Sequence, residues 1–174
     1  MIRIATERDI PAIAAIYDRI HDAEEAGRLA TGWLRGVYPT EDTARLALTE
    51  GDLFVLEDGG EITAAARINR RQVDVYAQVD WRYPATDDQV MVLHTLTVDP
   101  LKSGRGYGRK FLSFYEDYAH AHGSPVLRID TNERNAAARA MYARHGYIES
   151  GIVPTVFNGI PGVMLVCMEK RLDR

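Results

Sequence analysis

The feature that most constrains this chain is a run of alternating glycines between a strand pattern and a helix pattern. Residues 98–112 read VDPLKSGRGYGRKFL, with Gly104, Gly106 and Gly108 in the middle. Glycine lets neighbouring backbone N–H groups turn toward one point and lets a ligand approach the main chain closely. The helix that follows would direct the positive end of its dipole to the same point. The pattern predicts a phosphate-binding turn, with a tight turn among solvated charges as the alternative.

The surrounding side chains narrow the choice of ligand. Lys102, Arg105 and Arg109 add cations, which favours an anion with several phosphate oxygens. A dinucleotide fingerprint starting at Gly104 would need glycine or alanine at position 109, where this chain has arginine. The Gly-Lys-Ser/Thr of a Walker loop is absent from the run. A different phosphorylated ligand is therefore expected.

A second informative segment, residues 126–147, reads VLRIDTNERNAAARAMYARHGY. Its β-branched start predicts a strand, and its alanine-rich continuation predicts a helix that ends before Gly146. Asn135, Ala138, Arg139 and Tyr142 share one stripe of that helix at 3.6 residues per turn. The stripe could line a channel for a long thin ligand, or it could simply pack against a sheet.

Together the two segments resemble the GNAT superfamily of acetyl-CoA-dependent N-acetyltransferases. The resemblance follows the chain through HTLTVDP, the glycine turn, a helix over about 106–122, VLRIDT and NAAARAMYARHGY. The opening MIRIATERDIPAIAAIYDRI, a short strand and an amphipathic helix, is similar as well. The resemblance implies one N-acetyltransferase domain over residues 1–174 with an α/β (α+β) fold. Its sheet is expected to be mixed and mostly antiparallel, with helices on both faces and a splayed central strand pair.

The resemblance also implies a set of contacts to coenzyme A. Backbone groups of the turn would hold the pyrophosphate, the preceding strand would bond the pantetheine arm, and the later helix would contact the cofactor and its sulfur. The family usually has Arg or Gln where this chain has Ser103, a loss for which Lys102 or Arg105 can compensate. The expected cofactor-binding residues are Leu96, Thr97, Val98, Ser103, Gly104, Arg105, Gly106, Tyr107, Gly108, Arg109, Asn135, Ala138, Arg139 and Tyr142.

Acyl transfer to an amine requires attack on a thioester, stabilisation of an oxyanion and departure of a thiolate. Positioning of the reactants supplies several kcal/mol, so neither a metal nor a covalent enzyme intermediate is required. A phenol and a thiol differ by about 1.5 pKa units, so full proton transfer from Tyr142 to the thiolate would cost roughly 2 kcal/mol. Hydrogen-bond donation is the expected role. Alternation along the strand places His94 on one face with Val92, Leu96 and Val98, and some family members carry a Glu or His on this strand as a base or water relay. His94 is therefore the first candidate base, with His21 as the next, and a purely structural histidine is the alternative. Water and backbone carbonyls can also replace a dedicated base.

The acceptor is expected to be a small-molecule amine. Trp33, Tyr38 and Trp81 offer aromatic faces to a cation, and Asp130 could approach the site from beneath the cofactor sulfur. Trp81 belongs to a polar and aromatic insert over residues 71–88, for which a surface hairpin with charges that protect its edge is the favoured interpretation. The pattern does not separate polyamines, amino acids, aminoglycosides and protein N-termini.

Composition agrees with this assignment. A net charge of −4 and a pI near 5.7 argue against a general nucleic-acid-binding surface. The single cysteine, Cys167, lies in an apolar run and is expected to be a buried strand residue. Early charges exclude a signal peptide and no apolar run is long enough for a membrane span, so a cytoplasmic protein without membrane contact is expected. A homodimer is possible, but no seam in the sequence predicts one.

The remaining pattern predicts α/β alternation. Thr6 and Asp9 form a capping-box-like start to the first helix, and a second helix follows Thr40. Other expected features are an irregular stretch over residues 21–38, a hairpin turning at 58–60, adjacent strands over 90–98 and 126–131, and two closing strands around a 154–162 loop.

Two other functions remain compatible with the sequence. One is a non-catalytic acyl-CoA-binding or sensing domain, for which a phenol at position 142 would serve no purpose. The other is a nucleotide-binding protein that uses the same glycines, for which ATP or NAD would compete with coenzyme A.

Overall fold

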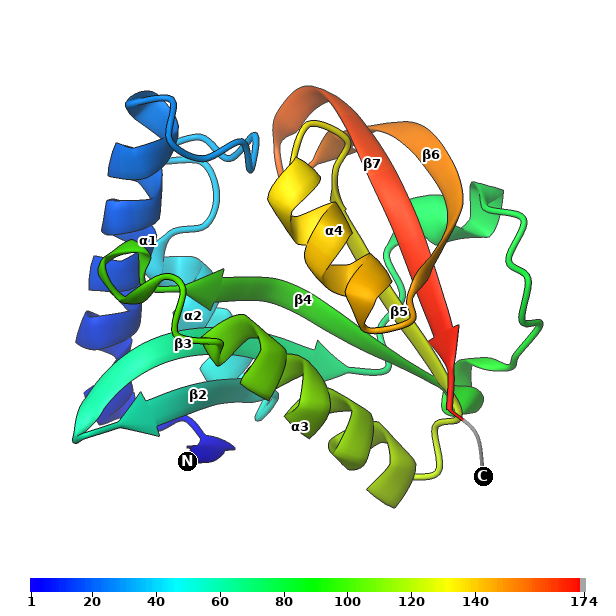
Figure 1. Ribbon diagram of the computed structural model, residues 1–174, viewed down its shortest axis with the longest axis horizontal. Helices are drawn as coiled ribbons and strands as arrows, with labels where there is room; N and C mark the ends of the chain where they lie inside the picture. Colours follow the sequence, from blue (N-terminus) through cyan, green and yellow to red (C-terminus); the bar gives the residue numbers. More distant parts are fainter. Residues whose placement is uncertain (173–174) are drawn as a thin grey trace.

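The computed structural model describes residues 1–172 (Figure 1). In this part of the chain, seven strands form one sheet in the order β1-β2-β3-β4-β5-β7-β6, and β4 with β5 is the parallel pair in an otherwise antiparallel set. No helix in residues 1–172 is long and apolar enough to cross a membrane. The elements are β1 (Ile2–Ile4), α1 (Ile10–Glu25), α2 (Glu41–Thr49), β2 (Leu53–Asp58), β3 (Glu61–Asn69), β4 (Val90–Val98), α3 (Tyr107–Ala121), β5 (Val126–Asn132), α4 (Ala136–Arg144), β6 (Ile148–Phe157) and β7 (Ile160–Arg171).

Helices cover both faces of the sheet, and the strands divide their side chains between them. Along β2, Phe54 and Leu56 join the core beneath α3, whereas Leu53 and Val55 join the core beneath α1 and α2. This is the period-2 alternation of a sheet that is buried on both sides. Tyr142 of α4 belongs to the same core as α3, so α3 and α4 share one face. The expected mixed sheet with helices on both faces is confirmed.

The parallel strands β4 and β5 separate partway along their length. They pair from Val90 to Leu93 on β4 and from Val126 to Ile129 on β5, and beyond this point the structure records no further pairing between them. The two strands open like a V in Figure 1, with α3 and α4 on one side. Beyond the last pair, the backbone N–H and C=O groups of β4 and β5 that point into the gap do not bond the other strand. They are therefore available to hydrogen-bond a ligand.

A bulge in β4 corrects the predicted alternation. Ala65 of β3 lies opposite Thr97, and Arg67 lies opposite His94, so β4 carries one extra residue. Thr95 in the bulge has φ 52°, an unusual conformation for a β-branched residue. Because of the extra residue, the later side chains of β4 point to the opposite face of the sheet from the one that strict alternation predicts. His94 shares its face with Val92 as expected, but Leu96 and Val98 pack toward the α3 core on the opposite face.

The end of the chain is also more regular than predicted. The expected 154–162 loop is wrong, because β6 and β7 form a long hairpin whose turn is Asn158–Gly159. Both turn residues have positive φ, at 47° and 85°, as a two-residue hairpin turn of the Asn-Gly kind requires. Pro154 lies inside β6, opposite Met164. An edge strand tolerates proline because one side of its backbone needs no partner.

The insert over residues 71–88 is not the surface hairpin that its sequence favours. It contains no strand, and it packs against the sheet through Tyr76, which is only 2% exposed. Buried Glu169 of β7 accepts hydrogen bonds from the backbone N–H groups of Arg82 and Tyr83 at 2.6 and 3.2 Å. The insert is therefore tied to the sheet by a buried carboxylate, which costs free energy unless it is hydrogen-bonded in this way.

The predicted irregular stretch begins later than expected, because α1 continues to Glu25. The segment that follows is held by Glu24, whose carboxylate accepts hydrogen bonds from the Thr31 and Gly32 backbone N–H groups at 2.7 and 2.9 Å. The second helix begins after Thr40, as predicted. The segment between α1 and α2 is therefore an ordered wall that faces β4.

Candidate active site

One large cavity, of about 1880 Å³, reaches from the glycine turn to the insert. We name its two parts the turn half and the aromatic half. The turn half is lined by Leu96, Thr97, Val98, Lys102, Ser103, Gly104, Gly106, Tyr107, Gly108, Arg109, Asn135, Ala138, Met141 and Tyr142. The aromatic half is lined by Trp33, Tyr38, Arg67, Asn69, Arg71, Gln72, Val73, Asp74, Val75, His94, Thr95, Asp130, Phe157, Val163 and Leu165.

The three glycines of the turn have different structural roles. Gly104 and Gly106 both have φ 77°, and Gly106 is the N-cap of α3. A Cβ on Gly104 would meet nothing within 4 Å, so the space beside it is open to a ligand. Within residues 1–172, the N–H groups of residues 104–106 form no hydrogen bond, and the first N–H groups of any helix have no intrahelical partner. The turn therefore presents a row of free amides that suits phosphate oxygens.

Gly108 has a packing role instead. A Cβ at this position would lie 2.9 Å from the Met141 Sδ atom, where α3 meets α4. Tyr107 is also structural in its side chain, which is buried and donates a hydrogen bond to the Asp58 carboxylate at 2.6 Å. Only their backbone groups are left for a ligand.

Two of the expected cations are placed differently from the prediction. Lys102 lines the cavity but forms an ion pair with Glu61, and Arg105 lies outside the lining. Arg109 lines the turn half and is exposed. Of these side chains, Arg109 is therefore the one best placed to add charge to the amides of the turn.

Helix α4 presents three of its four predicted residues to the cavity. Asn135 is the N-cap, and its Oδ1 accepts a hydrogen bond from the Ala138 N–H at 3.2 Å. Tyr142 is 5% exposed, and burial raises the pKa of its hydroxyl, so the phenol stays protonated. Arg139 lies outside the lining and pairs with Glu149 at 2.7 Å. Tyr142 thus lies in the same cavity as the glycine turn.

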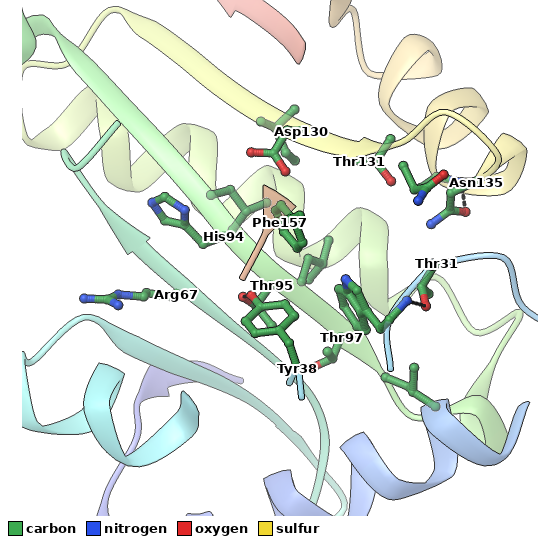
Figure 2. Close-up of a pocket in the computed structure, with 18 of the residues that line it drawn as sticks. Thr31, Tyr38, Arg67, His94, Thr95, Thr97, Asp130, Thr131, Asn135 and Phe157 are labelled. Carbon is green, nitrogen blue, oxygen red and sulfur yellow. Dashed lines mark hydrogen bonds between the residues drawn. The ribbon is translucent and has the colours of Figure 1, made fainter. Parts of the chain in front are cut away.

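Aromatic rings dominate the other half. The Tyr38 ring meets Trp33 and Phe157 edge-on, at centroid distances of 5.8 and 5.4 Å. Its hydroxyl forms a hydrogen bond with the hydroxyl of Thr95, the residue in the β4 bulge. Figure 2 shows Tyr38, Thr95, Phe157 and Asp130 around one hollow. Such edge-to-face aromatic packing makes a rigid apolar wall.

His94 is held as a neutral ring. Its Nε2 donates to the Asn69 Oδ1 at 3.0 Å, an orientation that follows because the Asn69 Nδ2 donates to Asp52 at 2.6 Å. Burial, with Arg67 and Arg71 nearby, lowers the pKa of His94 to about 4. A group with so low a pKa is a poor proton acceptor at neutral pH. The geometry therefore gives His94 a weaker claim to act as a base than its sequence position indicates.

Asp130 differs from His94 in that it is an acid whose pKa is raised and not lowered. It follows the last β5 residue that pairs with β4, and its Oδ2 accepts a hydrogen bond from the Tyr76 hydroxyl at 2.7 Å. Burial raises the pKa of Asp130 to about 6. No arginine, lysine or histidine within residues 1–172 forms an ion pair with it. A carboxylate without a counter-ion in a cavity is suited to bind a cation.

The structure places Trp33, Tyr38 and Asp130 in the aromatic half but leaves Trp81 outside the lining. Trp81 instead donates a hydrogen bond from Nε1 to the Tyr76 carbonyl at 2.9 Å, and the Arg128 guanidinium lies 4.0 Å from its ring centroid. The sequence offers Tyr76 as one of the aromatic residues of the insert, but it does not predict the hydrogen bond of Tyr76 to Asp130 or the place of Thr95 in the lining. The bulge and the packing of the insert give no local signal, so only the fold reveals them.

The free amides of the turn, the N-terminus of α3 and the gap between the splayed parallel strands suit a protein that binds a long ligand with phosphate groups. Comparison of the chain with known protein families identifies the family. Residues 14–147 match the acetyltransferase (GNAT) family, and the chain belongs to that family. Acetyl-CoA is the acetyl donor in this family, and the open cradle beside Gly104 and Gly106 fits its pyrophosphate.

Similar proteins agree with this membership. The chain is 26% identical to the N-acetyltransferase YhfO of Bacillus subtilis (strain 168) over 151 residues, which cover 85% of this chain and 89% of the relative. It resembles the yncA acetyltransferase of Salmonella typhimurium, solved with its cofactor acetyl-CoA, at 25% identity and a TM-score of 0.69, covering 100% of this chain and 94% of that one. A GNAT-family acetyltransferase of Streptococcus agalactiae 2603 shares the fold at 20% identity and a TM-score of 0.83, covering 100% and 96%.

Proposed function

We propose that residues 1–174 form one N-acetyltransferase domain that moves an acetyl group from acetyl-CoA to a primary amine of a small molecule. The observation that carries this proposal is that the free amides of the glycine turn and the phenol of Tyr142 line one continuous cavity. A small acceptor is favoured because the aromatic half is walled by the segment after α1, by the insert and by the β6–β7 hairpin. We propose transfer by direct attack within a ternary complex, since positioning alone supplies several kcal/mol.

Each part of the turn half has a task in this reaction. The amides of residues 104–109 and the N-terminus of α3 hold the pyrophosphate, with Arg109 adding charge. Backbone groups of Leu96 to Val98, which have no β5 partner, bond the pantetheine arm. When bound, acetyl-CoA supplies an activated thioester carbonyl. The protein keeps this group fixed at the opening between β4 and β5.

Tyr142 is proposed to donate a hydrogen bond to the sulfur as the thiolate departs. Its raised pKa keeps the proton on the phenol throughout the neutral range, so it acts as a donor rather than as a base. Stabilisation of developing charge by one preorganised donor contributes about 10²-fold or more in rate. A domain that only binds acyl-CoA would have no need for this donor.

The test is a thiol-release assay with acetyl-CoA and a panel of primary amines, with coenzyme A affinity measured separately. We expect Tyr142→Phe to lower kcat by about 10²-fold and to change coenzyme A affinity by less than about 3-fold, because one donor to the leaving group is lost. Tyr147→Phe is the matched control. The centroid of the Tyr147 ring lies 6.1 Å from that of Tyr142, but Tyr147 does not line the cavity. The kcat of Tyr147→Phe should therefore equal that of the wild type.

Two outcomes would contradict this proposal. Coenzyme A binding without thiol release in the presence of any amine would favour the non-catalytic acyl-CoA-binding domain. Competition by ATP or NAD at the same affinity as coenzyme A would favour a nucleotide-binding protein.

A further inference from the structure

The carboxylate of Asp130 stands out in the aromatic half. Among the described residues that line the cavity, Asp42 and Asp74 are solvent-exposed, whereas Asp130 is half-buried. Its Oδ2 is held by the hydroxyl of buried Tyr76. Its Oδ1 has no hydrogen-bond partner within residues 1–172, and it is not among the atoms shielded from solvent, so it is open to the cavity. One carboxylate oxygen is therefore fixed and the other is free for a ligand.

The basic side chains of the aromatic half are already neutralised. Arg67 pairs with Glu50 and lies 2.9 Å from the Asp52 carboxylate, and Arg71 pairs with Glu50 at 3.2 Å. His94 is uncharged at neutral pH. Within residues 1–172, two acids of this half, the exposed Asp74 and the half-buried Asp130, form no ion pair. The buried part of the half therefore offers a ligand the negative charge of Asp130.

Apart from its charged side chains and the uncharged polar side chains of Asn69, Gln72, His94 and Thr95, the aromatic half is apolar. Trp33, Tyr38 and Phe157 form one wall, and Val73, Val75, Val163 and Leu165 also line this half. A polyamine or an aminoglycoside carries several ammonium groups, each of which would need a carboxylate or water in this space. An amine with one charge and an apolar body leaves no group unpaired.

We propose that the acceptor is a primary amine with a single ammonium group and an apolar or aromatic body, and that Asp130, positioned by Tyr76, binds this ammonium and accepts one proton from it. The inference rests on the function proposed above. The proton moves from nitrogen to the Asp130 carboxylate, and the freed lone pair forms the N–C bond to the acetyl carbonyl. The C–S bond then breaks with its electron pair on sulfur, which gains the second proton of the amine. The proton on Asp130 is released to water.

The surroundings of Asp130 let its titration be observed separately. The titratable groups that face it are Tyr38 from the segment before α2, Tyr76 from the insert, Tyr142 from α4 and Cys167 from β7. Burial raises the pKa of each, to about 12 for Tyr38 and Cys167, so all four are neutral below pH 9. The pKa of Asp130, raised to about 6, lies apart from these values and from the value of about 4 for His94. An acidic limb near pH 6 in the pH–activity profile, where activity rises with pH, is therefore assigned to Asp130 when Asp130→Asn removes it.

The first experiment is the pH profile of kcat/KM from pH 5 to 9, with phenethylamine as the probe and acetyl-CoA saturating. We expect wild-type activity to rise through about pH 6 and then level off, because the ammonium form binds and Asp130 must be ionised. Asp130→Asn should lose that limb and about 10²-fold or more of its activity at pH 8, with unchanged acetyl-CoA affinity. Asp80→Asn, an exposed acid of the insert outside the cavity, is the matched control and should keep the wild-type profile.

Tyr76→Phe tests the positioning role. The Tyr76 hydroxyl favours the ionised carboxylate, so its removal should move the limb to higher pH rather than abolish it. Thermal melting at pH 8 should show Asp130→Asn to be at least as stable as wild type, because a raised folded pKa means that the ionised carboxylate opposes folding above its pKa. A limb that persists in Asp130→Asn and disappears in His94→Gln would overturn the assignment, as would activity that climbs steadily to pH 9.

The second experiment compares phenethylamine with spermidine, kanamycin and a peptide with an N-terminal alanine. We expect kcat/KM for phenethylamine to exceed the other values by at least about 10-fold, since each buried unpaired charge in the others is costly. A preference for spermidine, kanamycin or the peptide would overturn the acceptor class while leaving the transferase in place. Thiol release with none of the amines, despite acetyl-CoA binding, would overturn the proposed function itself.

Discussion

The two halves of the cavity are built in opposite ways. The turn half comes mainly from two local segments, the β4–α3 connection and the start of α4, and it offers backbone amides, a helix N-terminus and one phenol. The aromatic half takes single side chains from the segment after α1, from β3, the insert, β4, β5 and the β6–β7 hairpin. The binding proposed for the first half rests mainly on backbone groups, whereas that of the second depends on which side chains the fold brings together.

This difference teaches where specificity can reside. Backbone N–H groups offer the same hydrogen bonds whatever side chains their residues carry, so the turn half can tolerate a side-chain change such as Ser103. The aromatic half is determined by long-range packing, so its chemistry can change while the fold remains. Substitutions that affect one half and spare the other are the direct way to test this division.

The largest effect is expected from Gly106→Asp. The substitution places a side chain at φ 77° and a negative charge at the N-terminus of α3, beside the proposed pyrophosphate. We expect coenzyme A affinity to fall by about 10²-fold or more, which calorimetric titration would measure. Gly123→Asp is the matched control, since Gly123 has φ 70° and its Cβ would meet nothing within 4 Å at the other end of α3. Equal affinity loss in both variants would show that backbone strain, and not the cradle, is responsible.

Sequence reasoning was strong where structure is local. The strand over residues 90–98, the helix after Gly106, and the strand and helix over 126–144 all lie close to their predicted bounds. Each is marked by its own periodicity, by glycine or by a capping side chain, and each contributes to the turn half. The sheet topology came from the family resemblance, because strand order is not written in any single segment.

Sequence reasoning failed where contacts are distant. The bulge at Thr95 moves the later side chains of β4 to the other face of the sheet, and no residue in HTLTV indicates a bulge. The insert looked like a polar surface element because its anchors, Glu169 and Arg128, lie far from it in the chain. The ring of Trp81 predicts a role at the acceptor site, but in the structure this side chain packs against Tyr76 and donates a hydrogen bond to its carbonyl.

A smaller effect, confined to the aromatic half, is expected from Trp81→Leu. The substitution removes the hydrogen bond to the Tyr76 carbonyl and the ring that meets Tyr76 at a centroid distance of 5.1 Å. Because Tyr76 then holds Asp130 less firmly, we expect the amine KM to rise by roughly 10-fold, equivalent to about 1.4 kcal/mol. Steady-state kinetics with phenethylamine would measure the change, and coenzyme A affinity should stay within about 2-fold. An equal loss in coenzyme A affinity would mean that the two halves are coupled through the sheet.

The smallest effect, on stability and not on binding, is expected from Gly108→Ala. The new Cβ would lie 2.9 Å from the Met141 Sδ atom, so this flexible side chain must move. Overpacking of this kind costs about 1 kcal/mol, partly offset by the better helix propensity of alanine. In a Met141→Ala background the clash is absent, and Gly108→Ala should become neutral or stabilising, a non-additivity that denaturant unfolding of the four variants would show. A fall in coenzyme A affinity for Gly108→Ala in both backgrounds would instead assign this third glycine to the cradle, and the turn half would then need all three.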